Sequence, residues 1–148
     1  MEKRINVGQL EPTGYKALMG LESYLATTTI NKTHKELIKI RASQINGCAF
    51  CINMHTTDAR KHGETEQRIY LLNAWREVKD LYTDEERCVL AITEEVTLIS
   101  ERGLTQDTYD KATRLFEPDY IAQLIMAIVT INAWNRIAIS SQTQPAQV

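Results

Sequence analysis

The sequence predicts an all-α protein, a single-domain helical bundle of about six to seven helices that spans residues 1–148. Apolar residues recur at the spacing of helices throughout the chain, and the alternation typical of strands is nearly absent. Short polar segments separate the helical stretches, as they do in compact bundles. The chain is also long enough for one domain with a hydrophobic core.

Capping signals and helix breakers mark the expected elements in order. Thr27-Thr28-Thr29 ends the first helix, because three β-branched residues in a row are poor helix formers. Thr33 and Glu36 have the spacing of a capping box at the start of the second helix, which Asn46-Gly47 ends. A similar box opens at Thr83. We expect helices at residues 12–26, 33–46, 48–62, 65–76, 83–102, 105–116 and 118–139.

The last expected helix is apolar nearly all round, so we expect it to be buried on several sides. Either the rest of the bundle or a second subunit would cover it. Polar residues that are unfavourable in lipid interrupt this helix. Their presence indicates a core helix of the bundle and not a membrane span. These residues are Gln123, Asn132, Asn135 and Arg136.

Charge and cysteine content narrow the class of protein. A formal net charge of -2 without any basic cluster gives no reason to expect a nucleic-acid partner. The charged start Met1–Arg4 leads to no apolar segment, so no signal peptide is expected. Three cysteines, with one close pair and a distant Cys88, are unlike a secreted disulfide framework. We therefore expect a cytoplasmic protein.

Several residues with reactive or bulky side chains are expected to have only structural roles. Cys88 shares the apolar face of its helix with Ile99 and is expected to be a small buried hydrophobe. His34 and His62 lie at helix ends and are expected at the surface. Both tryptophans are expected to pack in the core or against it.

The close cysteine pair and a following histidine form the candidate functional site. Cys48, Cys51 and His55 have the spacing i, i+3, i+7, which places them on one stripe of a helix. One turn separates the two cysteines, a span that a disulfide tolerates, and His55 can meet Cys51. The helix N-terminus near Cys48 favours a thiolate. This arrangement indicates redox chemistry with a histidine as the base.

Glu36 is the fourth candidate, and its role has alternatives. If the turn at Gly47 folds two helices against each other, Glu36 can approach His55 and orient it or relay its proton. The alternatives are that Glu36 only closes a capping box and that His55 is a solvent-facing residue. The four side chains could formally bind zinc, but three ligands on successive turns of one helix strain a tetrahedron. We expect no metal and no cofactor.

The pattern E-x11-C-x-x-C-x-x-x-H resembles the AhpD-like alkyl hydroperoxidases of the carboxymuconolactone decarboxylase superfamily. The segments 43–51 and 54–60 are similar to that family's core, as is Ile131-Asn132-Ala133-Trp134-Asn135-Arg136. The resemblance covers the chain from about Pro12 to Ile139. The best-known members are longer and carry a histidine between the cysteines, where this chain has Ala49 and Phe50.

The resemblance implies an all-α fold that assembles as a trimer or hexamer and reduces hydroperoxides with an external thiol or protein disulfide reductant. By the same resemblance Cys51 is the peroxidatic thiol, His55 and Glu36 deprotonate it, and Cys48 resolves the product as a disulfide. The position of Cys48 at the helix terminus instead favours Cys48 as the peroxidatic thiol. Which cysteine attacks the peroxide and which one resolves the product therefore stays open. A general disulfide reductase and a non-enzymatic redox sensor are the alternatives. A lactone decarboxylase is disfavoured, because that chemistry needs no cysteine pair.

Overall fold

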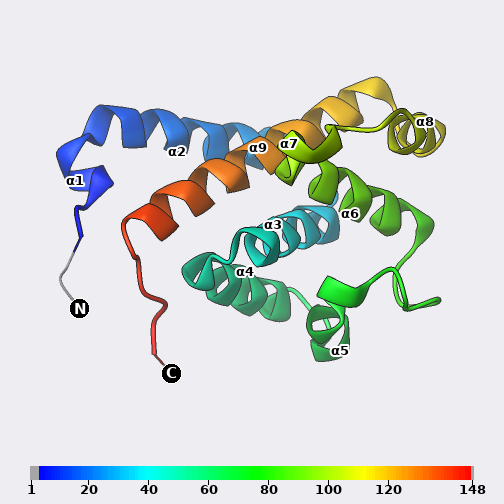
Figure 1. Cartoon of the computed structure of the whole chain (residues 1–148), viewed down its shortest axis with the longest axis horizontal. Coiled ribbons are helices and arrows are strands. Elements are labelled where there is room, and N and C mark those ends of the chain that lie inside the picture. Colours follow the sequence, from blue (N-terminus) through cyan, green and yellow to red (C-terminus); the bar gives the residue numbers. More distant parts are fainter. Residues whose placement is uncertain (1–3, 148) are drawn as a thin grey trace.

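The computed structural model describes residues 4–147, which form helices and connecting segments without any strand (Figure 1). The predicted all-α class is therefore confirmed. In order, these residues contain α1 (Val7–Leu10), α2 (Pro12–Thr27), α3 (Lys32–Asn46), α4 (Ala49–Lys61), α5 (Glu66–Tyr70), the 3₁₀-helix η1 (Leu72–Ala74), α6 (Asp84–Thr97), α7 (Ile99–Arg102), α8 (Gln106–Leu115) and α9 (Pro118–Ser140).

Short elements account for the difference from the expected number of helices. The helix expected at 65–76 consists of α5 and η1, and the carbonyl of Arg68 in α5 accepts a hydrogen bond from the Tyr82 hydroxyl. The helix expected at 83–102 is interrupted at Leu98, where φ -93° and ψ 43° leave the helical region. Beyond this break Ile99 is 59% exposed, so it does not extend the apolar face as expected.

Helix α3 lies at the centre of the bundle and packs against α4, α6 and α9 (Figure 1). Its residue Ile38 is completely buried, as are Val89 of α6 and Leu124 and Ile128 of α9. Burial of such side chains contributes about 1.5–3 kcal/mol each. This core fixes α3, and with it the helix that follows in the sequence, relative to α9.

Helix α9 is long and apolar enough to cross a membrane by length and composition alone, with a mean hydropathy of 1.3 over its most apolar stretch. In the structure it packs against α2, α3, α6 and α8, and its residues Asn132 and Asn135 are buried. It is therefore a core helix, as predicted. Its burial is incomplete, however, because Val129 and Ile139 are 45% and 42% exposed.

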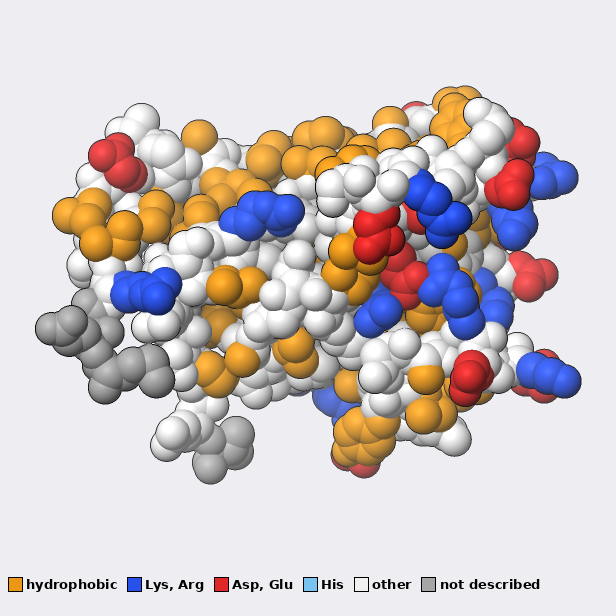
Figure 2. Space-filling model, viewed as in Figure 1, with side chains coloured by type: hydrophobic (Ala, Val, Ile, Leu, Met, Phe, Trp, Pro, Cys, Tyr) orange, Lys and Arg blue, Asp and Glu red, His pale blue; other side chains and the backbone are white. Residues whose placement is uncertain are grey.

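Hydrophobic and charged side chains gather at opposite ends of the molecular face in Figure 2. Hydrophobic side chains lie over the end formed by α1 and along the edge formed by α2 and α9, whereas most charged side chains lie near α5, α6 and α8. Exposed apolar residues on α2 include Tyr15, Met19 and Tyr24. The exposed side of α9 therefore continues into an apolar surface on α2.

The turn between α3 and α4 places the cysteine pair. Gly47 ends α3 with φ 71° and ψ 33°, a left-handed conformation that glycine adopts readily. The backbone N–H of Cys48 then donates to the carbonyl of Ser43, with an N–O distance of 3.0 Å. This turn confirms the predicted end of α3 and makes Cys48 the N-cap of α4.

The expected surface position of His34 is wrong, whereas that of His62 is confirmed. His34 is 5% exposed because its ring packs edge-on against Phe116 and Tyr120. Its Nδ1 lies 2.8 Å from the Tyr120 hydroxyl. Cys88 is buried as expected.

Both tryptophans have the expected packing roles. Trp75 is buried and donates its indole N–H to Glu94. Trp134 packs edge-on against Tyr15, with ring centroids 5.1 Å apart, and donates to Glu22. The aromatic pair therefore joins α9 to α2.

Candidate active site

Cys48 and Cys51 are free thiols at the first turn of α4. Both are almost fully buried, with 1% and 2% of their surfaces exposed, and they pack with Phe50 and Ala138. The backbone N–H of Cys51 donates to Sγ of Cys48 across 3.4 Å. The predicted position of Cys48 at the helix terminus is thus confirmed, and its sulfur receives one of the N–H groups that a helix start leaves unpaired.

Cys51 and His55 line one cavity of about 800 Å³ between α2, α3, α4 and α9. His55 is 7% exposed and lies one turn after Cys51. The wall is mainly apolar and aromatic, with Tyr15, Phe50, Met54, Trp134 and Ile137. The structure therefore combines a thiol, an imidazole and room for an organic molecule at one place.

The two ends of the described chain complete this cavity. Residues 4–8 and 141–144 both contribute to its wall. The Arg4 guanidinium donates to the carbonyl of Ser140 across 3.1 Å and ties the two segments together. Sequence reasoning missed this part of the site, because no local pattern brings residues so distant in the chain together.

The surroundings of Cys51 favour its protonated form at rest, whereas the resemblance implies a thiol that His55 and Glu36 deprotonate. Burial raises the pKa of the Cys51 thiol, and its hydrogen bond with the Cys48 side chain raises this pKa further. Interaction with the Asn135 side chain acts in the opposite direction and lowers the pKa. At neutral pH the resting Cys51 is therefore a thiol.

His55 is neutral at neutral pH. Burial lowers its pKa to about 4, and the positive charge of Lys39 lowers it in the same direction, while Asp58 acts against both. Lys39 also lines the cavity and pairs with Glu22 across 3.7 Å. A neutral imidazole can accept a proton, so His55 is in the state that a general base requires.

Glu36 lies in a different environment from the cysteines. Asn31 caps α3, because its side chain accepts from the N–H of Thr33, so Glu36 is too far along the helix to close the expected capping box. Glu36 lines a second cavity of about 280 Å³ together with Ala59 and His62. Its Oε2 is buried and has no hydrogen-bond partner among residues 4–147. Burial is also the main cause that raises the pKa of Glu36.

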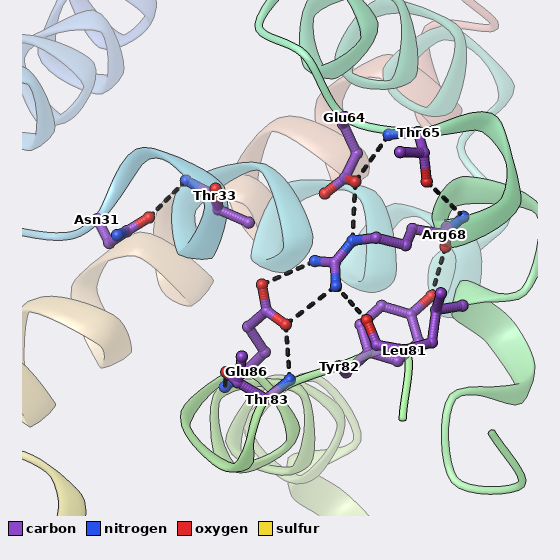
Figure 3. A network of polar contacts seen from close by, with 9 residues as sticks. All are labelled: Asn31, Thr33, Glu64, Thr65, Arg68, Leu81, Tyr82, Thr83 and Glu86. Carbon is purple, nitrogen blue, oxygen red and sulfur yellow. Dashed lines mark hydrogen bonds and ion pairs between the residues drawn. The ribbon is translucent and has the colours of Figure 1, made fainter. Parts of the chain in front are cut away.

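A salt-bridge network forms part of the wall of this second cavity (Figure 3). The Arg68 guanidinium donates to Glu64 across 2.8 Å and to the two carboxylate oxygens of Glu86 across 2.7 and 3.1 Å. Glu86 also completes the capping box with Thr83 at the start of α6. The network therefore fixes α5 to α6 and gives the cavity of Glu36 a rigid polar wall.

Of the four predicted residues, Cys51 and His55 thus line the larger cavity, Cys48 packs beside Cys51, and Glu36 lines the smaller cavity. Cys48, Cys51 and His55 come together at the start of α4, whereas Glu36 of α3 faces the smaller cavity, whose wall includes Ala59 and His62 at the other end of α4. Among residues 4–147, no group of three or more His, Cys, Asp or Glu side chains is arranged to hold a metal ion. Sequence reasoning missed Lys39 and gave no role to Asn135, which lies in the Asn-Ala-Trp-Asn-Arg segment of α9.

Comparison with known proteins identifies the family. The model of the carboxymuconolactone decarboxylase family matches residues 12–95, which is more than half of the chain. The chain belongs to this family, and its relatives place it among the AhpD-like members.

Three relatives show how far the similarity extends. The uncharacterized protein YdfG of Bacillus subtilis (strain 168) is 44% identical over 146 residues, or 99% of each chain. A crystal structure from Agrobacterium tumefaciens, of a protein of unknown function with a suggested AhpD role in antioxidant defence, has 39% identity and a TM-score of 0.94, covering 99% of this chain and all of that one. The alkyl hydroperoxide reductase AhpD of Maricaulis maris (strain MCS10) is 40% identical over 45 residues, 30% of this chain and 26% of that protein.

Proposed function

We propose that this protein is a thiol-dependent peroxidase that reduces hydroperoxides with the Cys48–Cys51 pair. The observation that carries the proposal is the shared cavity of Cys51 and His55, with a second thiol one helical turn away. The relatives named for AhpD and for antioxidant defence support the same class of reaction.

The reaction has two chemical steps. In the first, the sulfur of Cys51 attacks the outer oxygen of ROOH, the O–O bond breaks, and the products are Cys51 sulfenic acid and, after protonation, ROH. In the second, the sulfur of Cys48 attacks the sulfenic sulfur of Cys51, and water leaves as the disulfide forms. An external thiol or a protein dithiol then supplies two electrons and restores both cysteines.

Access and hydrogen bonding support different roles for the two cysteines. Among residues 4–147, the lining of the large cavity includes Cys51 but not Cys48, so a substrate in that cavity meets Cys51 first. The sulfur of Cys48 receives the N–H of Cys51 at the start of the helix. This hydrogen bond holds the sulfur of Cys48 one helical turn from Cys51, where a resolving thiol is required.

Proton transfer accompanies the attack in this proposal. Burial keeps Cys51 protonated and His55 neutral at rest, so the thiol proton moves to the imidazole only as the sulfur begins to react. Glu36 faces the smaller, polar cavity, and no residue in the described part of the chain bonds its buried Oε2. We assign to it the exchange of that proton between His55 and solvent, through a water molecule.

The remaining parts of the proposal concern the assembly and the compartment. The apolar surface on α2 and α9 supports a homo-oligomer, the family's trimer or hexamer. The same proposal treats residues 1–148 as one domain and places the protein in the cytoplasm, where reduced thiols are maintained. A general disulfide reductase is the second candidate, because two free thiols one helical turn apart can also exchange with another protein's disulfide.

Peroxide consumption with dithiothreitol as reductant tests the proposal. Wild type should consume an organic hydroperoxide catalytically, and Cys51→Ser should lose this activity. Cys88→Ser is the matched control and should retain the activity, because Cys88 lies in the core cluster formed by α3, α6 and α9. If wild type reduces a disulfide substrate but consumes no peroxide, the disulfide-reductase alternative replaces the peroxidase.

A further inference from the structure

A buried row of polar side chains on α9 faces the cysteine turn. Asn132 and Asn135 are 9% and 0% exposed, and Ala138, one turn further along the same face, packs against Cys48 and Cys51. Burying amide groups is costly unless they are hydrogen-bonded. Each of these asparagines accordingly has partners, which come from α3, α6 and α9 itself.

These partners determine which way each amide points, beginning with Asn132. A carbonyl can only accept, and a guanidinium can only donate. Because Nδ2 of Asn132 donates to the carbonyl of Ile128 and its Oδ1 accepts from Arg136, the orientation of the Asn132 amide is fixed. Its Oδ1 must then accept from Asn46, whose Nδ2 lies 2.9 Å away.

The same reasoning extends from Asn46 to Asn135. Nδ2 of Asn46 also donates to Oδ1 of Asn135 across 2.9 Å, so the Nδ2 end of Asn135 must point the other way. One of its two N–H groups donates to the Ser43 hydroxyl across 3.0 Å. The second N–H is not used by Asn46 or Ser43, and the Asn135 side chain acts on the Cys51 thiol in the direction that lowers its pKa.

We propose that Asn135 is a catalytic residue of the thiol site: its side-chain N–H donates to the sulfur of Cys51 and stabilises the thiolate that attacks the substrate. Ser43 and Asn46 are positioning residues, because they hold the amide with its donor end toward the sulfur. The chemical role rests on the proposed peroxidase function, but the hydrogen bond to the reacting thiol would serve any reaction of Cys51.

The other groups around Cys51 show why such a donor is needed. On its own helix, Cys48 favours the protonated thiol of Cys51, and the neighbouring His55 is neutral. The ionic groups around the same cavity are Lys39 of α3, its partner Glu22 of α2, and Arg4. Asn135 is the side chain of α9 that acts directly in favour of the charged form.

The test measures the titration of Cys51 without any peroxide. The rate of iodoacetamide alkylation at Cys51, read by mass spectrometry across pH, follows the fraction of thiolate. Asn135→Leu should reduce that fraction at a given pH below the midpoint by about 10- to 100-fold, the usual size of a hydrogen bond to a charged group. Thr130→Val is the control and should leave the profile unchanged, because this buried α9 hydroxyl bonds only its own helix, at Met126.

A second measurement decides the matter if Asn135→Leu does not fold. In wild type, the NMR signals of the buried Asn135 side-chain amide should shift with the same midpoint as the alkylation of Cys51. A folded Asn135→Leu with the wild-type alkylation profile, or amide signals that do not move while Cys51 titrates, would overturn the proposal. Neither readout requires turnover. Absence of peroxidase activity would therefore refute the proposed function, but it would not decide whether Asn135 stabilises the Cys51 thiolate.

Discussion

Replacing His55 with glutamine should make the protein less sensitive to acid. Burial lowers the pKa of His55 in the folded protein to about 4, from an ordinary value of 6.5. The unfolded chain therefore binds a proton at His55 as the pH falls below 6.5, whereas the folded chain does not until about pH 4. The stability that neutral His55 contributes is complete above pH 6.5 and is lost as the pH falls toward 4.

The magnitude follows from this difference between the two pKa values. Each pKa unit corresponds to about 1.4 kcal/mol, so between pH 7 and pH 4.5 the wild type should lose roughly 2–3 kcal/mol of unfolding free energy through His55. Urea unfolding followed by tryptophan fluorescence at both pH values measures this loss. His55→Gln cannot titrate and should lose less stability than wild type by that amount.

The comparison has a matched control and a clear contrary outcome. Thr130→Val, at a buried position without a titratable side chain, should have the same pH dependence as wild type. If His55→Gln also follows the wild-type dependence, His55 is protonated as easily in the folded protein as in the unfolded chain. The imidazole would then be solvated, and its assignment as a buried neutral base would be wrong.

Two further predictions concern the turn before the site and the assembly. Gly47→Ala should lower the free energy of unfolding in urea by roughly 1–2 kcal/mol, because alanine is strained at the φ of 71°. The added carbon itself meets no neighbouring atom within 4 Å. An unchanged free energy of unfolding would mean that the turn adopts another conformation. Sedimentation should show a species well above the 16.9 kDa monomer. Val129→Lys, on the exposed side of α9, should shift the protein toward the monomer. A monomeric wild type at micromolar concentration would contradict the predicted oligomer.

Local signals were sufficient to predict the parts of the site that lie on one helix. Cys48, Cys51 and His55 share α4 because helical periodicity alone places them on one stripe. The Asn46-Gly47 ending is equally local, since only the conformation of one glycine is involved. The all-α class could be predicted for the same reason, because helical periodicity is a local signal.

Features that depend on distant contacts could not be predicted in this way. His34 is buried by Phe116 and Tyr120, which are far away in the sequence. The capping box at Thr33 has the right residues, but Asn31 begins the helix earlier, so Glu36 faces a cavity instead. The raised pKa of Cys51 likewise depends on burial beneath α9, which no pattern around the cysteines reveals.

A single turnover without reductant tests the central claim, that Cys48 and Cys51 act as one redox pair, most directly. One equivalent of an organic hydroperoxide should convert the reduced protein to a form with one free thiol, that of Cys88, and peptide mapping should find Cys48 joined to Cys51. The hydroperoxide should be recovered as the corresponding alcohol. Recovery of unreacted hydroperoxide and all three free thiols under these conditions would contradict the account.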